Sequence, residues 1–300
     1  MLKVAWSECY AHLLPTGHRF PMEKYDLLPE QLVYEGTLSR ENFFAPELIE
    51  EKWFLNTHDP NYFRRLSALD LTPQEVRAIG FPLTASLVHR EMVIASGSVQ
   101  AAEFALSYGI GMNIAGGTHH AFSNRGEGFC LLNDIAITAN FLLENRLASR
   151  VLVVDLDVHQ GNGTAEIFKE RRDVFTFSMH GEKNFPHRKE KSHLDIGLPD
   201  GTGDLEYLTR LQQTLPRILE MFDPDFLIYQ SGTDVLASDQ LGRLNLSQSG
   251  IKERDETVVS LAKNNQIPLM CCMGGGYSKQ IKDIVEGHAQ IFRLAQSLYF

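Results

Sequence analysis

Short apolar runs alternate with longer stretches of helical periodicity along most of this 300-residue chain. The apolar runs are rich in β-branched residues and predict buried strands, because strands covered on both faces are apolar throughout. They lie at residues 3–6, 111–115, 151–155, 174–179, 226–230 and 268–273, and the helical stretches lie at residues 87–108, 133–145, 205–222 and 248–264. This alternation predicts an α/β protein with βαβ units and a mainly parallel sheet.

No internal repeat and no linker rich in Pro, Ser or Gly divides the chain. Residues 15–80 are more irregular and mostly helical, and we expect them to belong to the same domain. Asp204 and Ser247 are the expected N-caps of the two helices that follow them, since both residue types accept hydrogen bonds from free helix amides. We therefore predict one domain that spans residues 1–300.

The run VLVVDLDVHQGNGT at residues 151–164 ends an apolar strand in three polar residues at alternate positions. Alternate residues of a strand point to the same face, so Asp155, Asp157 and His159 should emerge together. A carboxylate and an imidazole two residues apart form half of a zinc-type site. Taken alone, the run fits a metal site and an ordinary polar strand end about equally well.

Polar clusters follow four other predicted strands, at the sheet edge where ligands bind in open α/β proteins. They are GGTHH at 116–120, His180, SGTD at 231–234 and GGGY at 274–277. Asp157, His159 and Asp234 would supply three ligands and leave a position for water, whose pKa a metal can lower to about 7. This convergence of strand ends favours the metal site.

The remaining polar residues suggest acid–base chemistry beside that metal. His119 and His120 could act as general base and general acid; tandem histidines alone are more often core or helix-cap residues, but a metal and a Gly-rich turn beside them reverse that preference. Tyr277 follows three glycines and could polarise a carbonyl. Asp155 could orient a histidine ring or bind an inner cation. The stretch 161–163 has no following Lys-Ser/Thr pair, so nucleotide binding is not expected.

The net charge of −10 argues against affinity for nucleic acid or an anionic membrane. An acidic surface would instead attract lysine-rich or polyamine ligands. The basic fragments KERR and HRKEK, around Arg171 and Lys189, are expected to be solvated loops. Four cysteines without CxxC spacing, no signal peptide and no long apolar run predict a reduced, cytoplasmic protein without a membrane span.

Five ordered motifs, GGTHHAF, GEGFCLLND, DLDVHQGNGT, SGTDVL and MGGGY, resemble the zinc-dependent histone deacetylase superfamily, which includes bacterial deacetylase-like and acetylpolyamine amidohydrolases. The resemblance extends from PTGHRFPMEKY near the N-terminus to GGGY. DLDVHQGNG and LGRLNLSQSGIKERDE are most similar to the class IV branch and its bacterial relatives. The resemblance implies the arginase/deacetylase fold, a parallel sheet of about eight strands flanked by helices.

The resemblance also implies roles for individual residues. Asp157, His159 and Asp234 match the zinc ligands, with ferrous iron as the other possible metal. His120 matches the proton shuttle, and His119 matches an electrostatic partner paired with Asp155. Tyr277 matches the tyrosine that polarises the scissile carbonyl. The implied substrate-binding residues are Gly128, Phe129, Phe185, Leu241 and Gly275, and the implied monovalent-cation site, usually potassium, comprises Asp155, Ser178, Met179 and nearby carbonyls.

Two departures from the class I pattern stand out. Asn162 replaces a second aspartate, and a neutral amide should leave His120 with a lower pKa than a carboxylate would. Around residues 80–82 nothing matches the rim aspartate that clamps the substrate backbone in class I enzymes.

The leading hypothesis is a zinc-dependent amidohydrolase that removes an acyl group from acylated lysine by metal-activated water. One alternative is a deacylase of small acyl amides such as acetylpolyamines. An arginase-like dinuclear manganese enzyme would need additional bridging carboxylates. A non-catalytic acyl-lysine-binding module is a further alternative, and the oligomeric state stays open.

Overall fold

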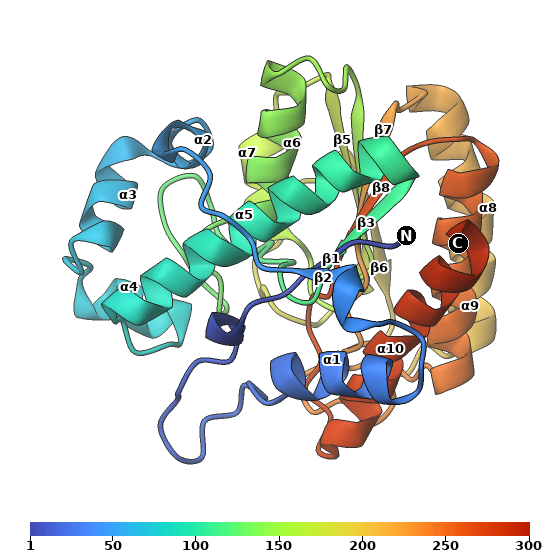
Figure 1. Cartoon of the computed structure of the whole chain (residues 1–300), viewed down its shortest axis with the longest axis horizontal. Coiled ribbons are helices and arrows are strands. Elements are labelled where there is room, and N and C mark those ends of the chain that lie inside the picture. The colour runs from blue at the N-terminus through green and yellow to red at the C-terminus, as the bar shows by residue number, and fades with distance from the viewer.

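A sheet of eight parallel strands forms the centre of the computed structural model, which describes residues 1–300 (Figure 1). The strand order is β2-β1-β3-β8-β7-β4-β5-β6. The strands are β1 (Val4–Ala5), β2 (Phe43–Phe44), β3 (Ile110–Asn113), β4 (Val151–Asp155), β5 (Val174–Gly181), β6 (Leu194–Leu198), β7 (Phe226–Gln230) and β8 (Leu269–Cys272). All six strands predicted from apolar runs are confirmed, and so is the parallel α/β fold.

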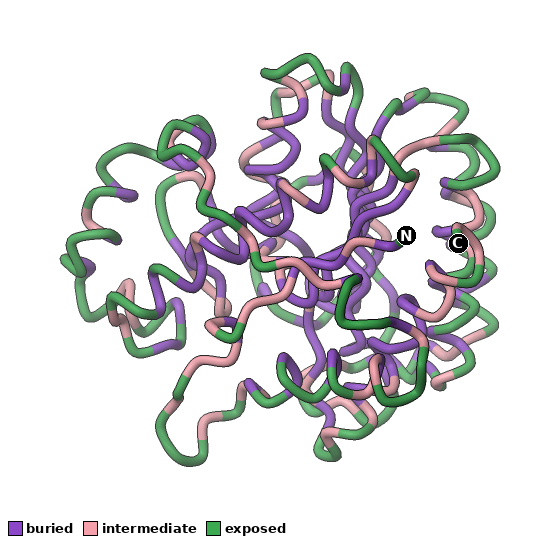
Figure 2. Tube along the Cα trace, viewed as in Figure 1, coloured by how far each residue is buried: buried purple, intermediate pink, exposed green.

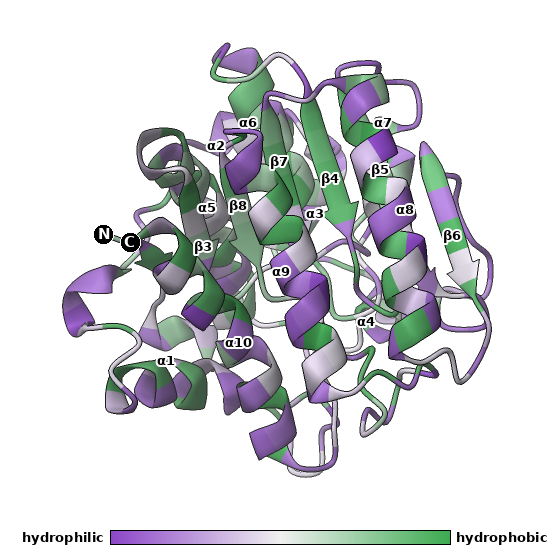
Figure 3. Cartoon of the chain, turned by 90° about the vertical axis from the view of Figure 1, so that its right-hand side faces the viewer, coloured by the Kyte–Doolittle hydropathy of each residue, from purple (hydrophilic) through white to green (hydrophobic).

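The two edge strands, β2 and β6, were missed by the apolar-run criterion. β2 contains only Phe43 and Phe44, which is too short to form a run. β6 has the sequence LDIGL and is largely half-buried, with Gly197 exposed. Edge strands lack a neighbour on one side, so they need not be apolar throughout. Figure 3 shows β6 at the edge of the sheet with mixed hydropathy, in contrast to the hydrophobic β4 and β7.

Ten α-helices surround the sheet. They are α1 (Lys24–Tyr34), α2 (Glu51–Leu55), α3 (Pro60–Ser67), α4 (Pro73–Ile79), α5 (Ala85–Tyr108), α6 (Asp134–Glu144), α7 (Asn162–Phe168), α8 (Asp204–Phe222), α9 (Gln248–Asn264) and α10 (Ile281–Tyr299). Helices α5, α6 and α7 cover one face, whereas α8, α9 and α10 cover the other, with α1 packed on α10 (Figure 1). The four predicted helices are confirmed. None of the helices is long and apolar enough to cross a bilayer.

Alternate residues of the central strands pack into two separate apolar clusters. In β4, Val151 and Val153 face the alanine-rich side of α5 and α6, while Leu152 and Val154 face the larger cluster that includes α8 and α9. All four side chains are buried, as Figure 2 shows for the whole central sheet. Burying each such side chain contributes about 1.5–3 kcal/mol. The well-packed sheet therefore gives rigid support to the loops at its carboxyl edge.

One of the two predicted N-caps is wrong. Ser247 caps α9, and its side chain accepts a hydrogen bond from the Gly250 amide. At α8 the N-cap is Gly203, and Asp204 is the first helical residue. The Asp204 carboxylate instead accepts hydrogen bonds from the Ser247 amide and hydroxyl, at 2.9 and 2.6 Å. It therefore links the start of α8 to the start of α9, a tertiary contact that local sequence cannot reveal.

Candidate active site

The loops that follow β3, β4, β7 and β8 meet at the carboxyl edge of the sheet and enclose one cavity. His119 and His120 come from the first loop, Asp157 and His159 from the second, and Tyr277 from the last. The predicted convergence of these strand ends is therefore what the structure contains. His180 marks the fifth strand end that was expected to contribute, and it lies at the end of β5. Its Nδ1 bonds the Ser178 hydroxyl at 2.9 Å, and its ring does not line the cavity.

Asp157, His159 and Asp234 lie at the floor of the cavity as a buried cluster. One ligand atom from each lies within 4.8 Å of the others. His159 Nδ1 is 3.0 Å from an Asp157 oxygen and 3.1 Å from an Asp234 oxygen. The backbone is held close by glycine, because a Cβ at Gly275 would lie 2.0 Å from Asp234 Oδ2 and one at Gly232 would lie 2.5 Å from Asp157 Oδ2.

The electrostatics of this cluster fit a divalent cation. Burial and the nearby Asp157 charge raise the pKa of Asp234 to about 7. Burial alone would lower the pKa of His159, but hydrogen bonds to the two carboxylates raise it to about 10. Two buried carboxylates thus compete for one imidazole as their countercharge. A cation bound among two carboxylate oxygens and one imidazole nitrogen would relieve that repulsion, and this donor set suits zinc.

The tandem histidines have different partners. His119 Nδ1 lies 2.7 Å from Asp155 Oδ2, and His120 Nδ1 lies 2.7 Å from Asn162 Oδ1. The Asn162 amide nitrogen donates to Glu127 at 2.7 Å. Because a carboxylate only accepts, the Asn162 oxygen must face His120, whose Nδ1 then carries a proton. In neutral His120 the other nitrogen, Nε2, is consequently the free acceptor.

These environments separate the two histidines electrostatically. Burial works against protonation of His119, but the adjacent Asp155 and Asp157 carboxylates outweigh it and raise its pKa. Burial and the neighbouring His119 and His159 hold the pKa of His120 well below its usual value. This lowering of the His120 pKa agrees with the expectation from the sequence, where its partner at position 162 is an amide and not a carboxylate.

Tyr277 is positioned by its backbone and by aromatic neighbours. Its amide donates to Asp239 at 2.6 Å. Its ring lies 5.9 Å from the Phe20 ring and 6.1 Å from the Phe129 ring, and 6.4 Å from that of His159. The pKa of the phenol is raised well above its usual value, mainly by burial and secondly by the charges of the nearby aspartates. The hydroxyl is therefore protonated and able to donate near neutral pH.

A cavity of about 470 Å³ leads from the surface to these groups. Phe129, Phe185 and Leu241 line it together with His120. Gly128 lies close to two of these rings, because a Cβ there would be 2.7 Å from His120 Cδ2 and 3.1 Å from Phe185 Cε1. The five implied substrate-binding residues thus lie around one tunnel, with Gly275 at its floor.

The residues of the implied monovalent-cation site lie beneath this floor. Asp155 pairs with Ser178 in the register of β4 and β5, and Met179 follows in β5. Asp155 already bonds His119, and the Ser178 hydroxyl bonds His180. The potassium site therefore stays a prediction.

Several residues that support the site were missed from the sequence. Glu127 orients Asn162, and Asp239 binds the Tyr277 amide. Lys24 is completely buried and donates to the Gly274 carbonyl at 3.2 Å. Arg254 donates to the carbonyls of Gly232, Leu156 and Ser231, next to the candidate metal ligands. No spacing rule marks such residues, because each acts through a backbone group or a side chain that is distant in sequence.

The expectation that the HRKEK fragment is simply solvated loop is wrong for Lys189. Its ammonium group donates to the carbonyls of Asn184 and Pro186, at 2.5 and 2.7 Å. Lys189 is half-buried and holds the loop that carries Phe185. Its positive charge is used inside the loop, a role that sequence composition does not show.

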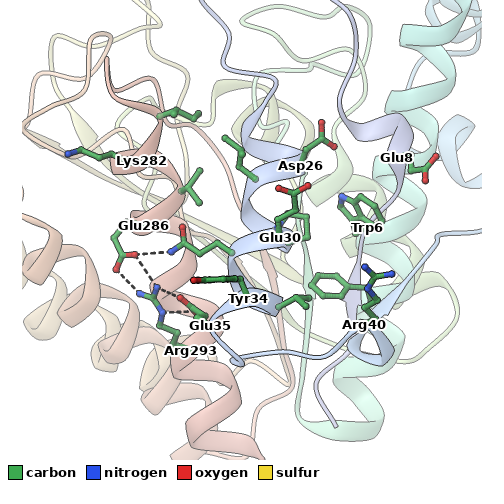
Figure 4. Close-up of a pocket in the computed structure, with 17 residues that line it drawn as sticks. Trp6, Glu8, Asp26, Glu30, Tyr34, Glu35, Arg40, Lys282, Glu286 and Arg293 are labelled. Carbon is green, nitrogen blue, oxygen red and sulfur yellow. Dashed lines mark hydrogen bonds and ion pairs between the residues drawn. The ribbon is translucent and has the colours of Figure 1, made fainter.

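A second, wider hollow lies elsewhere on the surface, between α1 and α10 (Figure 4). This α1–α10 groove has a volume of about 1510 Å³. Five carboxylates line it, from Glu8, Asp26, Glu30, Glu35 and Glu286, together with the cations of Arg40, Lys282 and Arg293. Arg293 bridges Glu35 and Glu286 at its lower end in Figure 4. The groove contains none of the candidate metal ligands and neither of the tandem histidines.

Comparison with known proteins adds to this geometry. Residues 18–292 match the histone deacetylase domain. The chain is 41% identical over 296 residues to an uncharacterized protein of Picosynechococcus sp., a match that covers 99% of each. It is 32% identical over 278 residues to histone deacetylase 2 of Arabidopsis thaliana, covering 89% of this chain and 72% of that protein.

The fold agrees as well. The crystal structure of the HDA15 HD domain matches with a TM-score of 0.82 over 99% of this chain and 88% of that one, at 19% identity. With a family match that runs from the segment before α1 into α10, and a site of the kind that the motifs predicted, the chain belongs to the histone deacetylase family of deacetylase hydrolases.

Proposed function

We propose that residues 1–300 form one catalytic domain of a zinc-dependent amidohydrolase that removes an acyl group from the ε-amine of lysine. The observation that carries this proposal is the buried cluster of Asp157, His159 and Asp234 at the floor of a narrow tunnel. It is the one cluster of three metal-ligating side chains in the structure. That supports a single catalytic metal rather than the two of an arginase-like enzyme.

Asp157, His159 and Asp234 would hold the metal. When bound, it would supply Lewis-acid polarisation of the amide carbonyl and lower the pKa of water at the site. Zinc is the proposed metal, and ferrous iron would fit the same donors. Asp155, Ser178 and Met179 are the proposed surroundings of a structural potassium ion.

His120 is the proposed proton acceptor. Asn162 and Glu127 leave its Nε2 free, and its low pKa keeps the ring neutral and ready to take a proton from the attacking water. His119, held by Asp155, would contribute positive charge close to the reacting atoms and support protonation of the departing amine. The two rings, 4.1 Å apart between centroids, would thus divide the acid and base roles.

Tyr277 would donate a hydrogen bond to the carbonyl oxygen as negative charge develops there. Asp239 holds its backbone, so the hydroxyl needs little reorganisation during the reaction. Phe129 and Phe185 would enclose the apolar stem of the lysine, and Gly128 leaves space for it.

The test is turnover of one lysine peptide that bears acetyl, butyryl, octanoyl or myristoyl groups. Release of any of these groups, with loss of activity in Tyr277→Phe, supports the proposal, and the preferred chain length measures the free length of the tunnel. Metal retention without turnover of the four peptides or of acetylpolyamines would contradict it and favour a binding role.

A further inference from the structure

The mouth of the tunnel carries positive charge, although the chain as a whole has a net charge of −10. Four cationic side chains line the 470 Å³ cavity, and no carboxylate does. These four residues, here called the basic rim, are Arg19, Arg77, Lys183 and Arg243. All four are exposed to solvent. A local field of this sign at the entrance acts directly on whatever approaches it.

A ring contact places Arg19 at the mouth, and backbone hydrogen bonds hold there the helix end that carries Arg77. The guanidinium of Arg19 lies over the Phe129 ring, 5.1 Å from its centroid, so it is attached to the tunnel wall. Arg77 is in the last turn of α4. The end of that helix is held to the tunnel, because the carbonyls of Ala78 and Ile79 accept from the amides of Gly128 and Phe129, at 3.0 and 2.7 Å.

The rim is only partly neutralised by the protein itself. Asp200 lies 3.3 Å from Arg243 and 4.0 Å from Lys183, and both pairs are solvent-exposed. Arg19 and Arg77 have no acidic partner within 4.0 Å. Since guanidinium groups stay charged at any physiological pH, two full positive charges remain at the entrance.

The basic rim lies where the backbone of the acylated lysine and its neighbouring residues must be during the reaction. An extended lysine side chain separates its amide nitrogen from its backbone by roughly 6 Å. With the acyl group at the tunnel floor, the backbone and its neighbouring residues therefore lie at the mouth. Charges there fall within the screening length of about 8 Å at physiological ionic strength.

We propose that the basic rim makes this enzyme select acyl-lysine whose surroundings carry a carboxylate, from flanking Asp or Glu or from the free α-carboxylate of lysine. This inference rests on the proposed function and specifies its substrate class. It discriminates against acyl-lysines in lysine-rich segments and against acylated polyamines, whose additional ammonium groups would be repelled at the mouth.

The experiment compares kcat/KM for three acetyl-lysine peptides that differ only in flanking Asp, Ser or Lys residues. The wild type should prefer the Asp peptide over the Lys peptide by about tenfold or more at low salt. The preference should shrink strongly in 1 M salt, where screening acts over about 3 Å. Free acetyl-lysine and its carboxamide, measured in parallel, identify whether the α-carboxylate is the recognised group.

The charge-reversal variant Arg19→Glu/Arg77→Glu should invert the Asp-to-Lys preference. Arg217→Glu/Lys252→Glu, with the same change in net charge on the exposed surfaces of α8 and α9, should keep it. If the reversed protein melts early, Arg19→Gln/Arg77→Gln should abolish the preference instead.

The outcomes separate the two proposals. Turnover of all peptides with equal kcat/KM, or a preference for the Lys peptide, overturns the basic-rim inference and leaves the deacylase standing. An equal loss of preference in both double variants also overturns it, because net charge rather than the rim would then decide. No turnover of a lysine peptide with any of the four acyl groups overturns the proposed function and the inference with it, and if only a longer acyl group is released, the three flanking-residue peptides carry that group instead of acetyl.

Discussion

The tunnel mouth and the α1–α10 groove are both open to solvent, yet their charges are opposite. The mouth is lined by four cations without a carboxylate, whereas five carboxylates and three cations line the groove. The net charge of −10 describes neither region. From that total an affinity for lysine-rich or polyamine ligands was expected, but the active-site entrance has the opposite sign. Local placement of charge, not the total, determines what approaches the site.

The tunnel floor differs from both regions because its charged groups are buried. Asp157 and Asp234 are at most 1% exposed, while the Arg293 side chain in the groove is 35% exposed. Breaking a buried charged cluster should therefore affect metal binding and catalysis far more than breaking an exposed ion pair affects stability. Four substitutions test this ranking, beginning with the largest expected effect.

Replacing the imidazole of the proposed metal site should have the largest consequence. His159→Ala removes the one nitrogen donor of the cluster, and kcat/KM should fall by on the order of 10⁴-fold or more. Elemental analysis of the purified variant should show reduced zinc. Full activity and full metal content in His159→Ala would show that the site lies elsewhere.

Tyr277→Phe should reduce kcat by about 10²–10³-fold, the usual effect of losing an oxyanion donor. The ring contacts with Phe20 and Phe129 are retained, so the melting temperature should hardly change. Steady-state kinetics and thermal unfolding measured on the same preparation check both statements. An unchanged kcat would exclude the assigned role of the hydroxyl.

Asn162→Ala should reduce kcat by about 10- to 100-fold. The variant loses the group that fixes the protonated nitrogen of His120, while all three proposed metal ligands remain. Glu127→Gln, one hydrogen bond further away, should have a smaller effect in the same direction. If Glu127→Gln were the more damaging of the two, the proposed chain from Glu127 through Asn162 to His120 would be wrong.

Arg293→Ala, in the groove, should have the smallest effect. Removing the bridge between Glu35 and Glu286 should lower the free energy of unfolding by about 1 kcal/mol, and thermal unfolding should show a melting temperature lower by about 2 °C. The kcat/KM of the variant should match that of the wild type, because the groove contains no residue of the site. A loss of activity would mean that the groove and the tunnel are coupled.

The same ion pair predicts a pH dependence. Hydrogen bonds to Arg293 lower the pKa of both Glu35 and Glu286 below the ordinary value of 4.5. A carboxylate with a depressed pKa in the folded state stabilises it above the unfolded-state pKa, and this contribution is lost as the pH falls. The stability difference between wild type and Arg293→Ala should therefore be constant near pH 7 and shrink below about pH 4.5. A difference that persists at pH 3 would point to packing rather than charge.

How much the sequence could predict depends on how local each feature is. The central strands were predictable because β4 and β7 are apolar at every position except the last, and the site residues because they lie at or directly after the ends of those strands. β2 and β6 were not, since an edge strand of two residues or with polar positions has no apolar run.

Supporting residues were the harder part of the site. The resemblance named His120 and Tyr277, but Glu127 and Asp239 act through contacts with residues 35 and 38 positions away. The basic rim was equally hard to predict from the sequence, because Arg19, Arg77 and Arg243 are far apart along the chain and come together only at the tunnel mouth. The sequence showed only that the rim aspartate of class I enzymes is missing, not what replaces it.

The most direct test of the central claim follows deacylation of an acetyl-lysine peptide by chelator-treated protein before and after zinc is added back. Asp234→Asn is measured in parallel as the variant with a damaged metal cluster. We expect the metal-free wild type to be inactive and to regain activity with stoichiometric zinc, whereas Asp234→Asn should stay inactive. Undiminished turnover by protein shown to be metal-free would contradict a metal-dependent mechanism at Asp157, His159 and Asp234.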